Sequence, residues 1–212
     1  MNNNLIIIGV AGGSGSGKSS IAKYILNYYS SNKCSIIEVD SYYRDLKHLV
    51  MEDREKNNFD HPKSIDFDLL IKHLNDIQLG KSISVPIYDY KTHTRTNRVN
   101  FIKPDKIVII EGLFALINNK VRNFMDIKVF VETDKDSRLK RRIKRDMRDR
   151  ARTYESIISQ YNKSVEPMYL KHIEPTKKFS DLIITQGVKN TIAMEQLISK
   201  IKHMKKDINK AE

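Results

Sequence analysis

A glycine-rich segment near the start of the chain has the residue types and the spacing of a phosphate-binding loop. Residues 12–19 read Gly-Gly-Ser-Gly-Ser-Gly-Lys-Ser, which matches the pattern GxxxxGK(S/T) in full. Glycines allow the backbone N–H groups to turn inward around a phosphate chain, and a helix that starts here adds the positive end of its dipole. Lys18 would then reach the β- and γ-phosphates as a point charge, and the Ser19 hydroxyl would ligate Mg²⁺.

The context of this segment agrees with the pattern. A short apolar run at 5–10 precedes it, and a helical pattern at 19–29 follows it. A flexible glycine turn is the alternative, which pattern and context together disfavour. We therefore predict a nucleoside triphosphate site formed by Gly12, Gly13, Ser14, Gly15, Ser16, Gly17, Lys18 and Ser19.

Two carboxylates close predicted strands that should end beside this loop. Glu111 follows the apolar run 107–110, at the point where P-loop proteins place the acid that holds Mg²⁺ through water, usually an aspartate. Asp40 closes the run 35–39, and ligands of open α/β sheets lie beyond the carboxyl ends of the strands. A carboxylate there can accept the proton of an attacking hydroxyl, as a kinase requires. The alternatives are a surface glutamate at a strand end and an aspartate that caps a turn.

The positive charge of the chain is concentrated in one segment. The sequence has 38 Lys and Arg against 26 Asp and Glu, a formal net charge of +12. Residues 138–152 hold nine of the basic residues and two aspartates, a local charge of +7. Such a run fits a solvated helix face, a surface for nucleic-acid phosphates or a site for the phosphates of a small ligand. Composition alone does not decide among these.

The length and composition fit one globular domain in a reducing compartment. Domains usually hold about 100–200 residues, so the 212 residues are expected to form one, with room for a small insertion. A chain with one cysteine, Cys34, cannot form an internal disulfide, which favours a cytoplasmic setting. The longest apolar runs are far shorter than the roughly 20 residues that span a bilayer, and the first residues lack a signal-peptide pattern. We expect neither secretion nor membrane insertion.

Apolar runs alternate with helical patterns along almost the whole chain, and this alternation predicts the fold. Strands are expected at 5–10, 35–39, 106–110, 127–132 and 181–185, helices at 19–29, 67–79, 136–150 and 191–206, and one or two further helices at 154–170. Short runs at 83–88 and 99–102, separated by a polar, threonine-rich connection, predict a two-stranded ribbon. Repeated strand–helix units predict a mostly parallel sheet with helices on both faces. The expected fold class is α/β, of the P-loop NTPase type, with a small β-ribbon insertion near residues 81–103.

Several further segments together resemble a known family. They are residues 39–44 (VDSYYR), 58–62 (NFDHP), 85–90 (VPIYDY), 93–95 (HTR), 141–146 (RRIKRD), 159–161 (SQY) and 174–177 (EPTK). As a set, collinear from about residue 5 to 195, they resemble the uridine–cytidine kinase family of P-loop nucleoside kinases. The resemblance implies phosphorylation of the 5′-hydroxyl of uridine and cytidine by ATP or GTP with Mg²⁺, in cytoplasmic pyrimidine salvage, and commonly a homotetramer.

The resemblance also implies a role for each matching residue. Asp40 would be the general base toward the 5′-hydroxyl, acting with Lys18, and Asp60 would hold the ribose hydroxyls with help from Arg142. Catalytic Arg145 and ATP-binding Arg150 would close over the triphosphate, as part of a basic lid at 138–152. The nucleoside site would take its aromatic wall from Tyr43, Phe59 and Tyr90, its contacts to position 4 of the pyrimidine from Tyr88 and His93, and its other polar edge from Arg152 and Gln160.

Two residues depart from the family pattern. Ala151 stands in the lid where relatives commonly have glycine, and Tyr90 stands where some have phenylalanine.

Two other functions are alternatives to a uridine–cytidine kinase. One is a kinase of another small alcohol, such as pantothenate or ribulose 5-phosphate, but those substrates have no planar base for the aromatic residues and for Tyr88 and His93. The other is a P-loop ATPase that binds RNA through the basic segment. Because phosphoryl transfer itself needs such cations, we expect no nucleic-acid partner.

Overall fold

The computed structural model describes residues 5–30 and 33–210 of the chain. The strands within these ranges are β1 (Ile6–Gly12), β2 (Cys34–Glu38), β3 (Ile83–Asp89), β4 (Thr94–Ile102), β5 (Ile107–Glu111), β6 (Ile127–Glu132) and β7 (Leu182–Thr185). The α-helices are α1 (Lys18–Tyr29), α2 (Met51–Glu55), α3 (Phe67–Gln78), α4 (Asn119–Arg122), α5 (Lys135–Arg150), α6 (Tyr154–Gln160), α7 (Glu166–Met168) and α8 (Thr191–Lys210). Short 3-10 or π segments join them: η1 (Val39–Tyr42), η2 (Pro62–Ser64), η3 (Tyr161–Val165), η4 (Tyr169–Ile173), η5 (Glu174–Phe179) and η6 (Gly187–Lys189).

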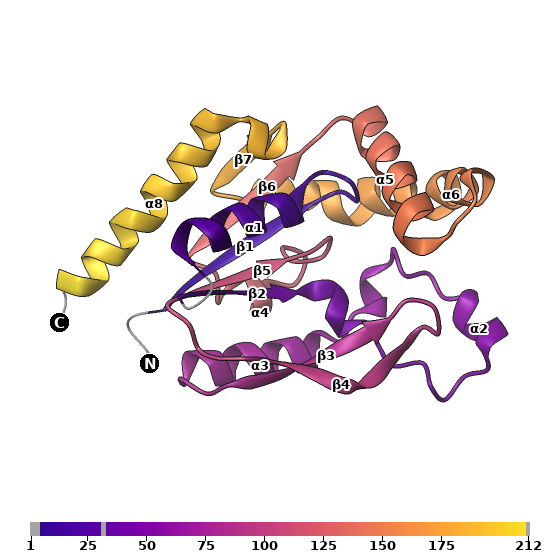
Figure 1. The fold of residues 1–212 in the computed structure, drawn as a ribbon, viewed down its shortest axis with the longest axis horizontal. Coiled ribbons are helices and arrows are strands. Elements are labelled where there is room, and N and C mark those ends of the chain that lie inside the picture. The colour runs from indigo at the N-terminus through magenta and orange to yellow at the C-terminus, as the bar shows by residue number, and fades with distance from the viewer. Residues whose placement is uncertain (1–4, 31–32, 211–212) are drawn as a thin grey trace.

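The central sheet is parallel, with the strand order β2-β5-β1-β6-β7. Ile8 of β1 lies opposite Ile109 of β5 and Ile127 of β6. β1 and β5 are rich in Ile and Val because both faces of the sheet are buried. Figure 1 shows α5 and α6 beyond the edge of the sheet at which β1 and β6 end. The predicted α/β fold with a parallel sheet is confirmed.

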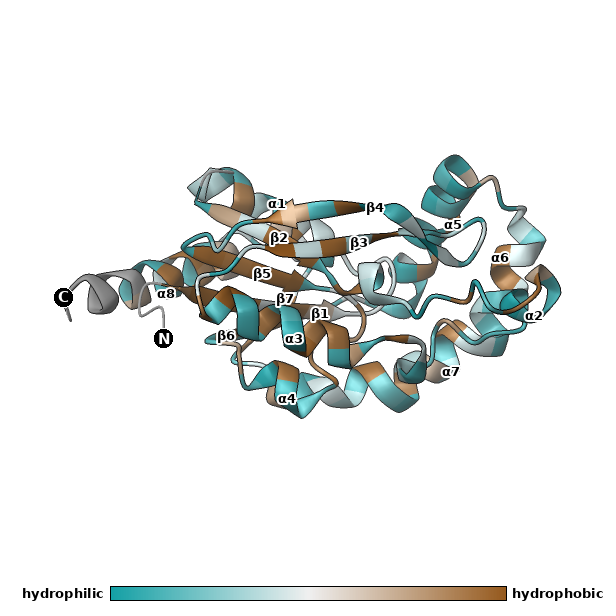
Figure 2. Ribbon diagram, turned by 90° about the horizontal axis from the view of Figure 1, so that it is seen from below, coloured by the Kyte–Doolittle hydropathy of each residue, from teal (hydrophilic) through white to brown (hydrophobic). Residues whose placement is uncertain are grey.

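Alternate side chains of the strands form a core on each face of the sheet. Ile6 and Ile8 of β1 belong to a buried cluster with residues of α1 and α8. Ile7 belongs to a second cluster, which includes residues of α3 and of the ribbon strand β3. Figure 2 shows hydrophobic residues concentrated in the strands and hydrophilic residues along α5. Helices therefore cover both faces, as predicted, and the packed sheet fixes the positions of its carboxyl ends.

The ribbon is confirmed, but it is longer than predicted. β3 and β4 pair in antiparallel fashion, and β4 begins at Thr94 rather than at residue 99. The first half of β4 is too polar to be recognised as a strand, although Thr94 is buried and Thr94 and Arg95 pair with the end of β3. Arg95 donates to the Tyr43 carbonyl (3.0 Å) and forms an ion pair with Asp66 (3.2 Å). These bonds fasten the ribbon to the segment that follows β2.

Other local predictions need correction. β2 ends at Glu38, one residue early, and Asp40 lies in the 3-10 turn η1 that follows. The segment 154–170, predicted as one or two helices, holds α6 and α7, and the π segments η3 and η4 lie on either side of α7, where Pro167 has no N–H to donate. The short helices α2 and α4 were not predicted, because so few residues carry no periodic pattern. None of the helices in the described residues combines the length and the apolar character that a bilayer crossing needs.

Candidate active site

The phosphate-binding segment runs from the end of β1 to the first turn of α1. Gly15 and Gly17 have φ angles of 79° and 101°, the left-handed region that favours glycine. A Cβ on Gly15 would lie 2.4 Å from the carbonyl oxygen of Arg138, so α5 packs directly against the loop. Lys18, the first residue of α1, is 9% exposed, and its Nζ donates to the Gly13 carbonyl (3.1 Å). The loop and its lysine therefore have the arrangement that the sequence pattern predicts.

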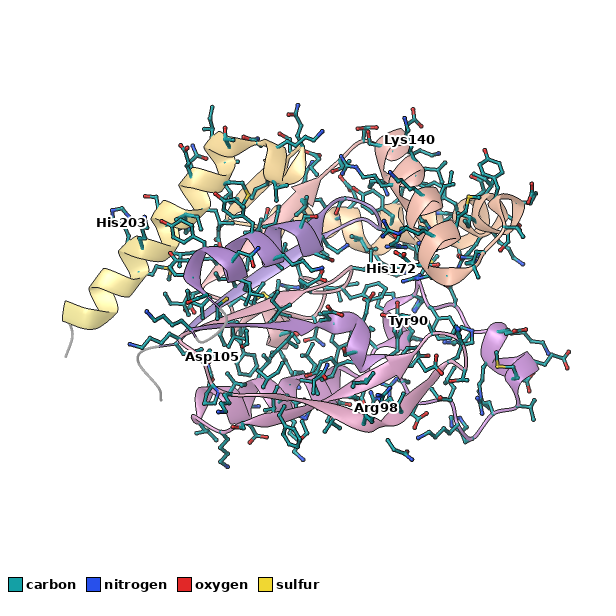
Figure 3. All side chains as sticks on the ribbon, in the orientation of Figure 1. Tyr90, Arg98, Asp105, Lys140, His172 and His203 are labelled. Atoms are coloured by element: carbon teal, nitrogen blue, oxygen red, sulfur yellow. The ribbon has the colours of Figure 1, made fainter. Side chains whose placement is uncertain are left out.

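Helix α5 braces the loop with the inward side of the basic segment. Arg142 donates to the Ser14 hydroxyl (2.9 Å), and the Arg138 guanidinium lies over the Tyr169 ring, 3.8 Å from its centroid. These two arginines are 5% and 3% exposed, whereas Lys140 is exposed on the outer side of the helix (Figure 3). The basic segment is therefore more than a solvated helix face, because part of it packs on the phosphate-binding loop.

Ser19 and Glu111 meet beside the loop. The Ser19 hydroxyl donates to Glu111 Oε1 at 2.8 Å, and Glu111 is the last residue of β5 and 7% exposed. Burial raises the pKa of Glu111, and the Lys18 ammonium opposes this shift. Among the described residues no group of three or more His, Cys, Asp and Glu could hold a metal ion. One hydroxyl and one carboxylate nevertheless suit Mg²⁺, which keeps several waters and takes further ligands from substrate phosphates.

Asp40 lies where several charges of the site converge. The residue is half-buried, and its Oδ1 is buried and has no hydrogen-bond partner among the described residues. Burial raises the pKa of Asp40, the cations of Lys18, Arg150 and Arg145 oppose this, and the Asp60 carboxylate adds to it. Burial also lowers the pKa of Lys18. The unbonded oxygen of Asp40 is available to accept a hydrogen bond, and then a proton, from a substrate hydroxyl.

The five predicted aromatic-pocket residues form one continuous set of contacts. The Phe59 ring stacks on the His93 ring, with centroids 4.6 Å apart and planes 16° apart, and meets Tyr43 edge-on at 5.6 Å. Tyr43 also contacts Tyr88 (5.2 Å), which meets Tyr90 (5.5 Å). The Tyr88 hydroxyl is buried without a hydrogen-bond partner among the described residues. Figure 3 shows Tyr90 between the ribbon and α5, so this wall faces the basic segment.

The polar residues predicted for the nucleoside are held by partners from α5 and η3. Arg142 and Arg152 both donate to Gln160 Oε1, the former at 3.0 Å. Asp60 Oδ2 accepts from the Ser164 hydroxyl at 2.9 Å, a contact that sequence reasoning missed. Ser164 follows Gln160 by four residues in a helical segment, the spacing that places two side chains on one face, and this was the available signal.

The two predicted lid arginines have different partners. Arg145 Nε donates to Asp146 Oδ1 at 2.8 Å, and the Arg150 guanidinium lies 4.9 Å from the centroid of the Tyr90 ring. Ala151 ends α5 with φ of 50°, a left-handed conformation that glycine adopts with less strain. Of the two cations predicted for the triphosphate, Arg150 therefore lies at the end of α5 against Tyr90 of the aromatic wall, whereas Arg145 lies earlier in the helix and is paired with Asp146.

A cleft that was not predicted lies beside the phosphate-binding loop. It has a volume of about 680 Å³ and is lined by Thr133 and Asp134 after β6, by Thr185 and Gln186 at the end of β7, and by Tyr169. The carboxyl ends of strands are where open α/β sheets bind ligands, so its position followed from the fold. Apart from Arg141, which begins the segment 141–146, its lining residues belong to no recognised motif, which is why they were missed.

Known proteins are similar to this chain over most of its length. Residues 7–193 match the profile of the Phosphoribulokinase / Uridine kinase family. The chain is 47% identical over 206 residues to a protein of Streptococcus thermophilus named uridine kinase, covering 97% of this chain and 98% of that one. It is 47% identical over 197 residues to a uridine kinase of Halalkalibacterium halodurans, covering 93% of each. The solved structure of phosphoribulokinase from Rhodobacter spheroides shares the fold, with a TM-score of 0.64 at 17% identity over 87% of this chain and 71% of that one.

Proposed function

The chain belongs to the phosphoribulokinase / uridine kinase family, and from this premise we propose that it is a uridine kinase. It transfers the γ-phosphate of ATP or GTP to the 5′-hydroxyl of uridine and cytidine, and gives UMP and CMP in cytoplasmic pyrimidine salvage. One observation carries the proposal: Asp40 follows β2 at the carboxyl end of the parallel sheet, where the phosphate-binding loop follows β1, and Tyr43 of the aromatic wall comes three residues later. A proton acceptor between a triphosphate site and a site for a planar base is what a nucleoside kinase needs.

On the acceptor side, the residues orient the nucleoside and move one proton. The aromatic wall stacks on the pyrimidine, and Asp60, oriented by Ser164, accepts hydrogen bonds from the ribose hydroxyls. Oδ1 of Asp40 accepts the proton of the 5′-hydroxyl as that oxygen attacks the γ-phosphorus, and the bond from this phosphorus to the β–γ bridging oxygen breaks to release ADP or GDP. Binding in this geometry places the two reacting atoms next to each other, which is the larger part of catalysis in phosphoryl transfer.

On the donor side, the residues hold and neutralise the triphosphate. The backbone of the phosphate-binding loop and Lys18 hold the phosphate chain, while Arg145 and Arg150 neutralise charge that develops during transfer. We place the donor's nucleoside in the cleft of about 680 Å³ beside the loop. Ser19 and Glu111 fit Mg²⁺, which supplies charge neutralisation between the phosphates when bound.

A nucleoside panel tests the proposed function. With ATP and Mg²⁺, we expect uridine and cytidine to be phosphorylated, and kcat/KM for thymidine and adenosine to be reduced by a factor of about 10² or more. Thymidine leaves Asp60 without a 2′-hydroxyl to bind, and a purine is too large for a pocket that fits a single ring. Products are identified by mass. ATP turnover without a nucleoside, with and without added RNA, is the control. Efficient use of thymidine or adenosine, or hydrolysis stimulated by RNA alone, would contradict the proposal.

Glu111→Gln tests the magnesium site. Removing the carboxylate charge beside Ser19 is expected to raise the Mg²⁺ concentration for half-maximal activity by about 10-fold or more. KM for uridine at saturating Mg²⁺ should stay unchanged. Glu38→Gln is a matched control, because Glu38 lies opposite Glu111 at the end of β2 and is exposed. Equal Mg²⁺ requirements in the Glu111 variant and the wild type would remove Glu111 from the metal site.

The remaining features of the proposal follow the family expectation. We take residues 1–212 as one kinase domain, with the nucleoside-binding ribbon near 81–103 and the basic lid near 138–152, and we expect a homotetramer without nucleic-acid or membrane partners. The contacts of Arg138 and Arg142 with the phosphate-binding loop support the lid assignment, because they tie the basic segment to the triphosphate site. The mass of the protein in solution tests the oligomeric state.

A further inference from the structure

Asp146 of α5 is fully buried and lies within ion-pair distance of four arginine side chains. Its two oxygens divide these arginines into pairs. Oδ1 lies 2.7 Å from Arg145 and 3.7 Å from Arg150. Oδ2 lies 3.5 Å from Arg142 and 3.7 Å from Arg152. Sequence reasoning assigned this carboxylate no role, and the mechanism above does not use it.

The two oxygens contact arginines that have different neighbours. In the proposed function, on which this inference rests, Arg145 and Arg150 serve the triphosphate. Arg142 and Arg152 both donate to Oε1 of Gln160 on the nucleoside side, and Arg142 also donates to the Ser14 hydroxyl of the phosphate-binding loop. One buried carboxylate therefore contacts the arginines of both sites.

The main chain of Asp146 fixes the same region. Its carbonyl accepts from the N–H of Ala151, which caps α5, and from the N–H of Arg152 at 3.3 Å. The four arginines bring more positive charge than one carboxylate neutralises, and an anionic phosphate chain can neutralise the excess. Asp146 and Arg142 are buried, so their charges act on each other more strongly than they would at the surface, whereas the other three arginines stay partly exposed.

We propose that Asp146 is a positioning residue that couples the binding of the phosphate donor to the binding of the nucleoside. The donor's phosphates attract Arg145 and Arg150, which leaves the carboxylate to Arg142 and Arg152. These two arginines are then held more firmly by Asp146, and they keep Gln160 in place to bind the pyrimidine ring. Each substrate tightens the binding of the other, and by the same factor, because a coupling free energy between two sites is reciprocal.

The wild-type protein alone provides the first test. We expect calorimetric titration to show that a saturating β,γ-imido analogue of ATP with Mg²⁺ lowers the Kd of uridine by about 5-fold or more. AMP, which lacks the β- and γ-phosphates, should leave the Kd of uridine unchanged. If the analogue has no effect, or if AMP has the same effect, the inference is wrong whatever any variant does.

Asp146→Asn and Asp136→Asn provide the matched comparison. Asp136 lies in the first turn of the same helix, outside the lid, and is exposed. In Asp146→Asn the ratio of the two uridine Kd values should fall toward one, whereas Asp136→Asn should keep the wild-type ratio and the wild-type kcat. A general loss of stability would weaken both Kd values and leave their ratio unchanged, so the ratio distinguishes coupling from a structural role.

The outcomes separate this inference from the proposed function. If uridine neither binds nor is phosphorylated, the proposed function fails. If uridine is phosphorylated and folded Asp146→Asn keeps the wild-type ratio, the inference alone fails. Thermal melting establishes whether the variant is folded. If it is not, the comparison of the ATP analogue with AMP in the wild type still tests the coupling on which the inference depends, and the absence of coupling would overturn it.

Discussion

Replacing Lys18 by alanine is expected to lower kcat by about 10³-fold or more, which is the range lost when a group that stabilises the charge of the transition state is removed. Lys18 is buried at the first residue of α1, and its Nζ is held at the Gly13 carbonyl within the phosphate-binding loop. Because the ammonium group is already held in the loop, little side-chain entropy is lost when it binds the phosphates during transfer. The measurement is kcat at saturating ATP, Mg²⁺ and uridine.

The control for this variant is a lysine on the same helix. Lys23 of α1 is exposed, and Lys23→Ala should keep wild-type turnover. The Kd of uridine measured without ATP should be nearly the same in Lys18→Ala and the wild type, because the nucleoside contacts other elements. Turnover of Lys18→Ala above a tenth of the wild-type value would remove the basis for the triphosphate site.

The parts of this protein that could be predicted are those encoded in a local pattern. The buried strands β1 and β5 are short runs of Ile and Val, and α3 shows apolar residues at helical spacing between Asp66, which caps its first turn, and Gly80. The phosphate-binding loop is a pattern of eight consecutive residues, so its position, its glycine conformations and the location of Lys18 all followed from the sequence.

The parts that could not be predicted depend on segments far apart in the chain. The hydrogen bond between Asp60 and Ser164 joins residues 104 positions apart. The spacing from Gln160 could point to Ser164, but no local pattern identifies Asp60 as its partner. The first half of β4 is polar, and only its pairing with β3 makes it a strand. The arginines around Asp146 illustrate a further limit, since charge counting found the basic segment but did not show which side chains turn inward.

Asp40 stands between these two cases, and it is the residue on which the proposed chemistry depends most. The sequence predicted Asp40 at the end of β2, with a turn as the alternative, whereas its place in the 3-10 turn η1 just after β2 and its unbonded Oδ1 became visible only in the structure. Asp40→Asn keeps the shape of the side chain and removes the proton acceptor. We expect kcat to fall by about 10²–10⁴-fold, the usual contribution of general acid–base catalysis, with the low end applying where the transition state is loose.

The pH dependence gives an independent check on the same residue. Burial raises the pKa of Asp40 above its usual value of 3.8, against the opposing charges of Lys18, Arg150 and Arg145 and together with Asp60. A general base works in its ionised form, so activity is present above this pKa and is lost as the pH falls through it. The acidic limb of kcat should therefore lie at higher pH than an ordinary aspartate would give. Asp40→Asn should abolish this limb.

Binding measurements decide between a catalytic base and a binding residue at position 40. If Asp40 acts on the proton of the 5′-hydroxyl, Asp40→Asn changes kcat and leaves the Kd values of uridine and ATP nearly unchanged, because the aromatic wall, Asp60 and the phosphate-binding loop remain. Asp68→Asn on α3, which is exposed, serves as the control and should behave as the wild type. An unchanged kcat would exclude Asp40 as the base. A collapse of uridine affinity with little change in kcat would make it a binding residue, and the proton acceptor would then have to be another group near the γ-phosphate.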